Sequence, residues 1–403
     1  MPRQISHDFR AVSRPLRLHS GNGALEQLGP ELARAGINRA LLITGRSLAE
    51  GTDLVDRMQA SAEGRIAAVF GAMRKDTPLP DVQAATALAR EVDADGLIAL
   101  GGGSVIQGAR VTAILLAETG TPEALATQYP DDGPAISPRL LAPKLPIFNA
   151  LTIGTTAQDR GGSPVKAPEL GRRLEYFDPK TRPAALFWDR DALATAPESM
   201  LRATVAMTYW RALLDMGAST ANVLADLNRA QVWTLTKGMQ RALAAGDDGD
   251  ALRGDLCVAT WLQNRAVDDG ARPVETWVSR LTYAFSVALF HQHGDLAQGA
   301  ATSALAPSIL REMGARDPAA MAGMAEALSI EGRAAADLPQ VIADRLTSDL
   351  AALGHATDLT ALGISPDGVT AMLDNAMSNF NADPRREFRR ERDRLAEVLA
   401  ACW

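Results

Sequence analysis

Three consecutive glycines, placed between an apolar run and a helix-like segment, constrain this chain more than any other feature. Residues 97–100 are apolar, Gly101, Gly102 and Gly103 follow, and Ser104 begins the next segment. Four apolar residues in a row are typical of a parallel strand that is covered on both faces. Glycines permit positive φ angles and let a ligand approach the backbone, and Ser104 can cap a helix whose free N–H groups favour an anion. The stretch predicts a cradle for a pyrophosphate or, alternatively, a tight turn that binds nothing.

The order of strand and helix signals predicts two domains, because 403 residues exceed one ordinary core. Buried strands are expected at 39–44, 65–70, 97–100, 147–152 and 184–188, and helices at 25–32 and 80–92. From about residue 197 helical periodicity dominates, at 200–227, 230–245, 256–266, 276–290 and 385–399. The predicted fold class is an α/β N-terminal domain with a doubly wound parallel sheet, residues 1–193, followed by an all-α C-terminal domain, residues 194–403.

The charge, hydropathy, cysteine and histidine content of the chain indicate which partners, cellular location and metal sites to expect. The net charge of −7 gives no basic field, so we expect no nucleic-acid partner. No apolar stretch reaches the length of a transmembrane helix or a signal peptide, so no membrane partner is expected. The two cysteines cannot form a disulfide framework, and a cytoplasmic location is expected. With only five histidines, two of them close together, a histidine-rich metal site is hard to assemble.

The ordered set of motifs resembles the iron-containing (group III) alcohol dehydrogenases, which include the maleylacetate reductases. Residues 101–104 resemble the family's GGGS turn, and residues 155–163 resemble its threonine- and glycine-rich loop. Residues 292–294 resemble its PHG motif, and residues 381–385 resemble its C-terminal NPRP stretch. The resemblance covers nearly the whole chain. It implies the dehydroquinate synthase-like fold, a homodimer, a nicotinamide cofactor and a small-molecule substrate in the cleft between the domains.

The resemblance also implies a divalent metal held by one aspartate and three histidines, and here the chain departs from the family. Thr208 stands at the aspartate position, Ala212 and Ser279 stand at two histidine positions, and His293 is the one ligand that remains. A further family histidine near the substrate corresponds to Tyr283. Neutral hydroxyls are poor ligands for a transition metal and alanine offers none, so no metal is expected at this position.

The resemblance assigns the cofactor to two glycine-containing turns and one loop. The residues expected to bind it are Gly45, Arg46, Gly101, Gly102, Gly103, Ser104, Gln107, Thr155, Thr156 and Ser163. Gln107 and Arg110 replace an aspartate and a lysine of the family pattern. Gly45 and Arg46 occupy the turn where the family often carries an aspartate that selects NAD. The missing carboxylate and the adjacent arginine would accommodate NADP, and a plain turn with a solvated arginine is the alternative.

Without a metal, protein donors have to polarise the reacting oxygen. The catalytic candidates are Tyr283, His293, Arg280 and Thr208. Tyr283 and His293 could act as a donor pair, and Arg280 with Arg211 could clamp a carboxylate. The alternatives are a core tyrosine, a helix-end histidine and surface arginines.

These residues predict a metal-independent NAD(P)-dependent oxidoreductase that acts on a small activated carbonyl or alcohol, such as an oxo acid. Two alternatives stay open. One is a non-redox enzyme, of lyase or decarboxylating type, that reuses the cleft. The other is an inactive homologue that acts as a binding partner.

Overall fold

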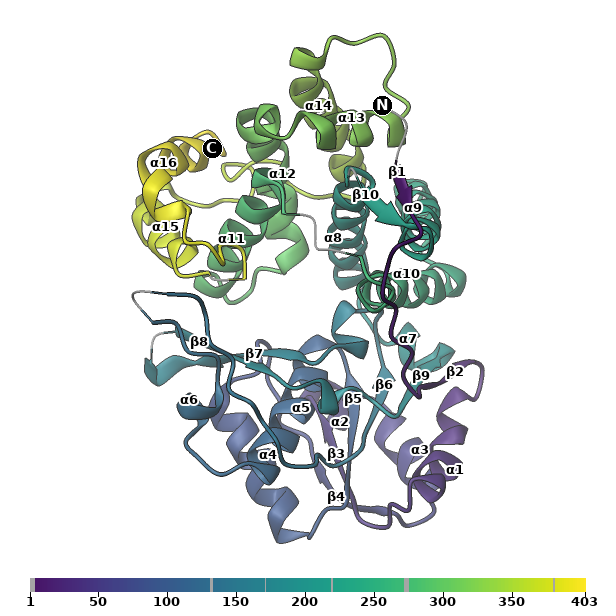
Figure 1. Cartoon of the computed structure of the whole chain (residues 1–403). Coiled ribbons are helices and arrows are strands. Elements are labelled where there is room, and N and C mark those ends of the chain that lie inside the picture. Colours follow the sequence, from purple (N-terminus) through teal and green to yellow (C-terminus); the bar gives the residue numbers. More distant parts are fainter. Residues whose placement is uncertain (1–3, 131–132, 171, 219, 272–274, 380) are drawn as a thin grey trace. The chain divides into compact units, whose positions relative to one another are not determined.

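The computed structural model describes residues 4–130, 133–170, 172–218, 220–271, 275–379 and 381–403. The chain forms two compact units: Ser13–Pro197, and a helical unit that joins Met1–Val12 to Glu198–Trp403 (Figure 1). The predicted boundary lay between residues 193 and 194. The units differ from this prediction in two ways: the later boundary falls between Pro197 and Glu198, and Met1–Val12 belongs to the helical unit.

Unit Ser13–Pro197 is built on a six-stranded, fully parallel sheet, which confirms the predicted α/β fold class. Its strands, in spatial order, are β2 (Arg17–Gly21), β9 (Ala185–Asp189), β6 (Ile147–Leu151), β5 (Gly96–Gly101), β3 (Ala40–Thr44) and β4 (Ile66–Phe70). All five predicted strands form. The strand order reverses between β3 and β5, and in open α/β sheets ligands bind beyond the carboxyl ends of the strands at such a point.

Helices cover both faces of this sheet (Figure 1). They are α1 (Leu28–Arg34), α2 (Arg46–Gly51), α3 (Leu54–Ser61), α4 (Leu79–Glu91), α5 (Gly103–Ala117), α6 (Pro122–Leu125) and α7 (Arg190–Ala194). Leu28, Leu32, Leu54 and Met58 from α1 and α3 pack against Ile98 and its neighbours on the sheet. On the other face α4 and α5 pack against each other and against the sheet.

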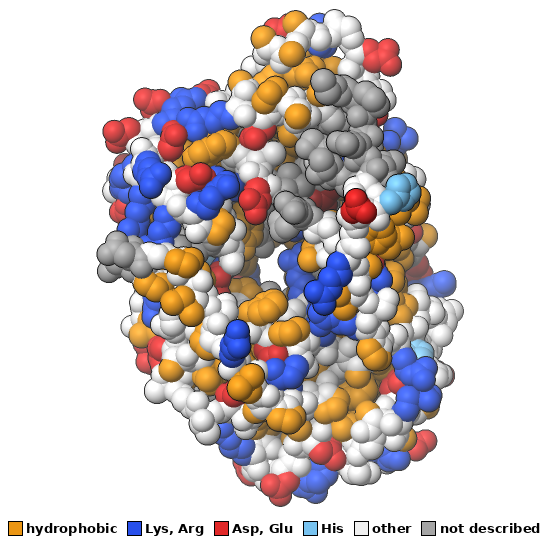
Figure 2. All heavy atoms as spheres, viewed as in Figure 1, with side chains coloured by type: hydrophobic (Ala, Val, Ile, Leu, Met, Phe, Trp, Pro, Cys, Tyr) orange, Lys and Arg blue, Asp and Glu red, His pale blue; other side chains and the backbone are white. Residues whose placement is uncertain are grey.

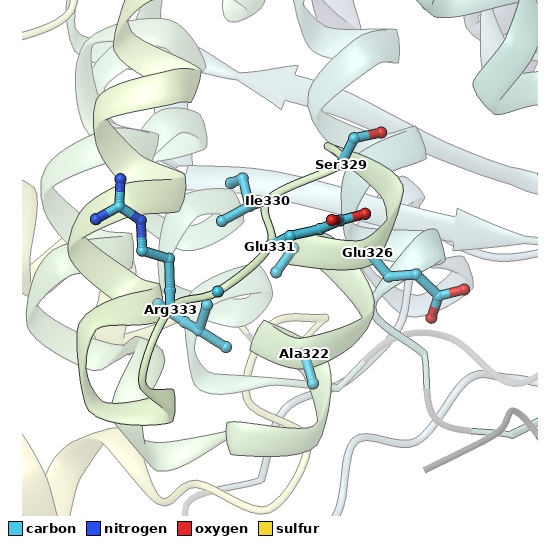
Figure 3. Close-up of a pocket in the computed structure, with 9 residues that line it drawn as sticks. Ala322, Glu326, Ser329, Ile330, Glu331 and Arg333 are labelled. Atoms are coloured by element: carbon cyan, nitrogen blue, oxygen red, sulfur yellow. The ribbon is translucent and has the colours of Figure 1, made fainter.

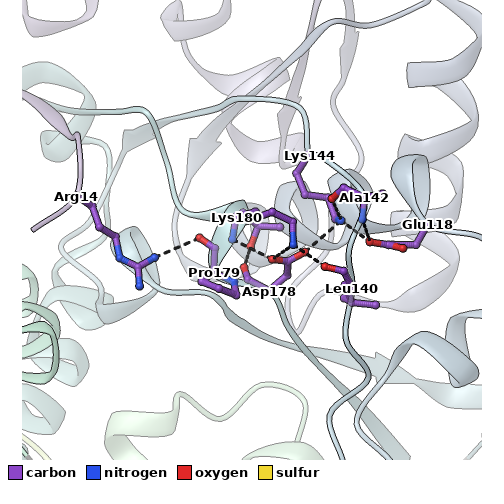
Figure 4. Close-up of polar contacts among 9 residues, drawn as sticks. Arg14, Glu118, Leu140, Ala142, Lys144, Asp178, Pro179 and Lys180 are labelled. Atoms are coloured by element: carbon purple, nitrogen blue, oxygen red, sulfur yellow. Dashed lines mark hydrogen bonds and ion pairs between the residues drawn. The ribbon is translucent and has the colours of Figure 1, made fainter. Parts of the chain in front are cut away.

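An antiparallel hairpin that the sequence analysis did not predict lies beside α5. It consists of β7 (Gly162–Ala167) and β8 (Arg172–Phe177). The turn after β8 is held by the buried Lys144 ammonium, whose Nζ lies 2.6 Å from Glu118 Oε1 and 3.1 Å from Asp178 Oδ2 (Figure 4). Nζ also donates to the Ala142 carbonyl. A buried ammonium with two carboxylates and a carbonyl is fully paired, so this network is structural.

The helical unit is organised around α12 (Gln298–Met313), against which α8, α11 and α14 pack. Its helices are α8 (Glu198–Met216), α9 (Val223–Ala244), α10 (Asp250–Asp268), α11 (Trp277–Gln292), α13 (Pro318–Ala327), α14 (Leu338–Ala352), α15 (Val369–Met377) and α16 (Arg392–Ala400). The prediction of an all-α domain needs one correction. Strand β1 (Gln4–Ser6) pairs in parallel with β10 (Thr220–Asn222), which interrupts the helix expected at 200–227.

Charged side chains of both signs are intermingled on the surface of the helical unit (Figure 2). Near the C-terminus, ion pairs join Arg392 to Asp374 and Arg394 to Glu312. Exposed pairs of this kind contribute little to stability and are typical of a solvated surface. In the part of the chain that the structure describes, no helix is long and apolar enough to span a membrane.

The backbones of α12 and α8 approach each other closely at Gly299. A Cβ atom added to Gly299 would lie 1.8 Å from the Ala203 carbonyl oxygen. Only a residue without a side chain allows the two helices to approach so closely, because real Cβ contacts are never this short. Gly238 on α9 is also helical, but a Cβ atom there would meet nothing within 4 Å.

Replacing Gly299 by alanine is expected to destabilise the helical unit by about 2–3 kcal/mol, since overpacked helix contacts shift the backbone. Gly238→Ala is the matched control and should be neutral or stabilising by up to about 1 kcal/mol, because alanine favours the helix. Denaturant unfolding followed by tryptophan fluorescence measures both. Equal stability of the two variants would show that this contact does not limit the packing of α8 on α12.

Candidate functional site

The glycine turn joins β5 to α5 in a conformation that requires glycine. Gly101 has a φ of +152°, and a Cβ atom on it would lie 2.9 Å from Val105 Cγ2. Gly102 is the N-cap residue of α5, and Gly103 is the first residue of the helix. The N–H groups of a helix's first turn have no acceptor within the helix, so they point out at the carboxyl edge of the sheet. This arrangement can bind an anion such as a pyrophosphate.

Ser104 does not cap α5, which corrects the sequence prediction. It is the second helical residue, and its Oγ accepts a hydrogen bond from the Asp76 backbone N–H at 3.0 Å. The Thr77 hydroxyl donates to the Ser104 carbonyl at 2.9 Å and lies 3.3 Å from Gln107 Oε1. Ser104 and Gln107 therefore fasten the loop after β4 to the start of α5. Because Ser104 Oγ accepts this bond, its own O–H can still donate to a ligand.

Asp76 and Thr77, which the sequence analysis did not single out, are the unusual residues of this loop. Both have left-handed backbones, with φ of +66° and +53°, a conformation that costs free energy in a non-glycine residue. Burial raises the pKa of the Asp76 carboxyl, and the Lys75 and Lys166 ammonium groups act in the opposite direction. Lys166 Nζ lies 4.0 Å from the Asp76 carboxylate. The adjacent sequence Thr-Pro before a helix was the available signal for a special loop.

The loop after β6 lies directly against the glycine turn. An added Cβ atom on Gly103 would lie 3.5 Å from Thr155 Oγ1, and one on Gly102 would lie 3.4 Å from Ile153 Cγ2. Thr155 caps the short helix Thr156–Asp159 by accepting from the Ala157 N–H. The structure thus brings Thr155 to Gly103 and Ile153 to Gly102, so the loop and the glycine turn of the cofactor prediction are neighbours. Ser163 lies elsewhere: it is buried and its Oγ is 3.3 Å from Arg110 Nη1.

The turn after β3 completes this edge of the sheet. Gly45 is the N-cap residue of α2, and an added Cβ atom would lie 3.2 Å from the Met73 carbonyl oxygen. Leu48 of α2 approaches within 3.7 Å of the Cβ position of Gly101, so the two turns are neighbours. Arg46 is exposed and lies 3.6 Å from Glu50 across one turn of helix. Its guanidinium is accessible to a ligand.

Arg280 is a structural residue, which argues against the predicted role as a substrate clamp. Its Nε donates to the Ala382 carbonyl, Nη1 to Glu387 and Nη2 to Asp383, at 2.8, 2.6 and 2.5 Å. The guanidinium is buried and packs against the rings of Trp277 and Phe388. Each nitrogen already has a partner, so Arg280 ties α11 to the C-terminal segment. Arg211, the other proposed clamp, lies 3.8 Å from Asp215 on the same helix.

The positions that correspond to the family's metal ligands do not form a metal site. The buried Thr208 hydroxyl donates to the Thr204 carbonyl at 2.7 Å, and the Ser279 hydroxyl donates to the Thr276 carbonyl at 2.9 Å. Both hydroxyls are thus used within their own helices, and Ala212 offers no donor atom. Throughout the described ranges, no group of three or more His, Cys, Asp or Glu side chains could hold a metal ion. These residues do not fit a divalent transition metal.

Tyr283 and His293 cannot act as a directly hydrogen-bonded pair. Tyr283 lies on α11 and His293 is the residue that caps its C-terminus. Ten residues of helix separate them, which corresponds to about 15 Å along the axis. Both side chains are exposed, Tyr283 at 38%. Each can meet a ligand alone, and the same holds for the half-buried His291.

Aromatic side chains occupy buried positions on α8 next to Thr208. Tyr209 is buried, stacks on Trp233 and donates to Asp349 Oδ2 at 2.6 Å. Burial and the Asp349 carboxylate raise the pKa of Tyr209, so the phenol stays protonated. Trp210 is buried as well. These two residues support packing and do not face a ligand.

A separate hollow lies in the helical unit where α13 leads into α14, and it was not predicted (Figure 3). It is lined by Ala322, Ala325, Glu326, Ser329, Ile330, Glu331, Gly332, Arg333 and Leu338. Figure 3 shows Glu326 and Arg333 directed to different sides, so their charges do not converge on one point. The hollow lacks the convergent polar groups of a binding site.

Comparisons with known proteins agree with this geometry. Residues 15–190 match the family model described as iron-containing alcohol dehydrogenase. The chain is 24% identical to a maleylacetate reductase of Sphingobium indicum over 376 residues, which cover 92% of this chain and 91% of that protein. A stretch of 114 residues, 28% of each chain, is 36% identical to long-chain-alcohol dehydrogenase 1 of Geobacillus thermodenitrificans.

Solved structures share the fold over nearly the whole chain. An alcohol dehydrogenase from Oenococcus oeni has a TM-score of 0.81, with 18% identity over 99% of this chain and 100% of that one. A maleylacetate reductase from Rhizobium sp. has a TM-score of 0.71, with 18% identity over 99% of both chains. Residues 15–190 therefore match an iron-containing alcohol dehydrogenase domain, and the relatives and solved structures that the chain resembles are alcohol dehydrogenases and reductases.

Proposed function

We propose that this protein is a metal-independent, NAD(P)-dependent oxidoreductase that acts on a small activated carbonyl or alcohol, such as an oxo acid. One observation carries the proposal. The glycine turn keeps the open geometry of a nucleotide cradle, whereas the hydroxyls at the metal positions are bonded within their helices. The likeness to a maleylacetate reductase supports an oxo acid as the substrate class.

The nucleotide would lie against Gly101, Gly102, Gly103 and Thr155, with its pyrophosphate at the N-terminus of α5. The Ser104 O–H would donate to a phosphate oxygen. The turn at Gly45 presents no carboxylate to repel a 2′-phosphate, and the exposed Arg46 guanidinium can pair with one. These features favour NADP while admitting NAD. As in the family expectation, the active form would be a homodimer.

The nicotinamide supplies or accepts the hydride when it is bound. This chain's residues then have to hydrogen-bond the reacting oxygen and supply or remove its proton. Tyr283 is the proposed donor because it stands at an exposed position on α11 and its phenol O–H can donate a hydrogen bond. His293, also exposed, is a second donor that would act independently. A hydrogen-bond donor directed at the reacting oxygen would stabilise the negative charge that develops there, which is part of what a Lewis acid would do.

The glycine turn is tested by Gly102→Val. A branched side chain there would project into the cradle and toward Ile153, so NADPH affinity should fall by more than about tenfold, equivalent to about 1.4 kcal/mol. The enhancement of NADPH fluorescence on binding measures it. Gly254→Ala on α10, where a Cβ atom meets nothing within 4 Å, is the control. Unchanged NADPH affinity in the Gly102 variant would remove the proposed cofactor site.

The proton donor is tested by Tyr283→Phe, which keeps the ring and removes the hydroxyl. Turnover of an oxo acid with NADPH should fall by more than about tenfold, the lower range for a positioned acid. The control is Tyr129→Phe. Tyr129 lies in the unit Ser13–Pro197, and its hydroxyl donates to Glu175 of the same unit. Wild-type turnover in the Tyr283 variant would exclude Tyr283 from the reaction.

Metal independence is tested by chelation. Dialysis against EDTA should leave both turnover and the thermal midpoint unchanged, because the hydroxyls of Thr208 and Ser279 cannot hold an ion. Added Fe²⁺ or Zn²⁺ should bring no increase. Loss of turnover on chelation, with recovery on adding one of these metals, would contradict the proposal.

A further inference from the structure

Arg110, on the third turn of α5, is the largest fully buried side chain that carries a charge. Its Nη1 donates to the Gly162 carbonyl at 2.7 Å and lies 3.3 Å from Ser163 Oγ. Its Nε and Nη2 are also buried, and neither has a hydrogen-bond partner among the described residues. The Nη1 group of the guanidinium therefore has acceptors, and the edge formed by Nε and Nη2 has none among the described residues.

The charged side chains around Arg110 do not supply an acceptor for its Nε and Nη2 groups. Arg160 and Arg182 both act to lower the pKa of Arg110, and the Asp159 carboxylate acts to raise it. Asp159 lies 3.8 Å from Arg182 Nη1, so its carboxylate is shared with a second arginine. Burial is the largest effect, and together these groups lower the pKa of Arg110 to about 9. The cluster holds three guanidinium groups and one carboxylate.

A buried guanidinium with N–H groups that lack an acceptor on one edge is destabilising, and a ligand that provides the missing acceptor would remove this cost. An oxyanion fits this vacancy chemically, because the Nε and Nη2 groups of arginine form a fork that matches two oxygens of a carboxylate or phosphate. The cluster is not sealed. Arg182 retains 15% and Asp159 13% of their side-chain surface, and Arg160 is half-buried.

We propose that Arg110, with Arg160 and Arg182, forms a binding site for one oxyanion group, a carboxylate or a phosphate, borne by a small acid or by the dinucleotide. The open fork of Arg110 would hold the group, and the other two arginines would attract it and neutralise its charge. The site lies wholly within the unit Ser13–Pro197. It therefore does not depend on hydride transfer, on Tyr283 or on the metal positions.

The test compares thermal unfolding of the wild type with Arg110→Met and Arg90→Met. Arg90 also donates to a backbone carbonyl, that of Leu115, but it is exposed and serves as the matched control. Each protein is measured in chloride, in phosphate and in succinate at equal ionic strength, and with NADPH. Comparing variants within one salt cancels the general stabilisation by phosphate.

In chloride we expect Arg110→Met to unfold at a higher temperature than the wild type, because it removes an uncompensated buried charge. Millimolar phosphate or succinate should then raise the midpoint of the wild type and of Arg90→Met, but not that of Arg110→Met. A succinate shift that depends on Arg110, with an NADPH shift that does not, assigns the site to a small acid. An NADPH shift that depends on Arg110 assigns it to a cofactor phosphate.

Arg110→Lys keeps the charge and can reach Gly162, but it lacks the fork. We expect its apparent oxyanion affinity to be about tenfold weaker than wild type, as for lost hydrogen bonds to a charged group. This variant decides the matter if Arg110→Met fails to fold. Equal anion shifts in wild type and in either Arg110 variant would overturn the proposal, as would a lower midpoint of Arg110→Met in chloride with no anion effect. NADPH binding that persists in these cases would leave the proposed function intact.

Discussion

The backbone at Gly101 is the constraint on which the ligand edge of the sheet depends. Its φ of +152° turns the chain from β5 into α5 within two residues, and the missing side chain leaves room for Val105. Because the turn is so short, the first turn of α5 opens at the carboxyl edge of the sheet. The loops after β3, β4 and β6 then gather around it, through Leu48, Ser104 and Thr155. A longer turn would separate these three loops.

The sequence predicted those elements whose signal is local. Four of the five predicted strands are apolar runs that become buried, as in the fully buried β5, whereas β4 forms at the edge of the sheet and is only partly buried. Strand β2 was missed because it is an edge strand with mostly exposed residues, Arg17 and Ser20 among them. The hairpin β7–β8 alternates buried and half-buried residues and begins with glycine, and β10 has three residues, too few for a recognisable pattern.

In the candidate site too, residues within short motifs could be predicted, and contacts between residues far apart in the sequence could not. The glycine turn and Thr155 could be placed from short motifs, and the structure brings them together. The contact of Asp76 with Ser104 spans 28 residues, and that of Arg110 with Gly162 spans 52. No motif marks such pairs. Arg280 was misjudged for the same reason, since its partners Asp383 and Glu387 lie more than a hundred residues away.

The helical unit keeps its packing although its ligand positions have changed. Thr208 and Ser279 satisfy their hydroxyls on the preceding helical turn, and Tyr209 stacks on Trp233. Helices α8 and α11 both rest on α12, where Gly299 allows a close approach to α8. Hydrophobic contact and backbone proximity between α8, α11 and α12 thus contribute to holding the unit together.

The pairing of β1 with β10 has a consequence for synthesis on the ribosome. Gln4 is paired with Thr220, so the first strand emerges 216 residues before its partner. At ordinary rates of translation this delay is on the order of ten to forty seconds. Unit Ser13–Pro197 is complete before the partner strand appears. The nascent N-terminal strand therefore has to stay unpaired while the unit Ser13–Pro197 folds, and the pairing of β1 with β10 forms only in the later stages of chain growth.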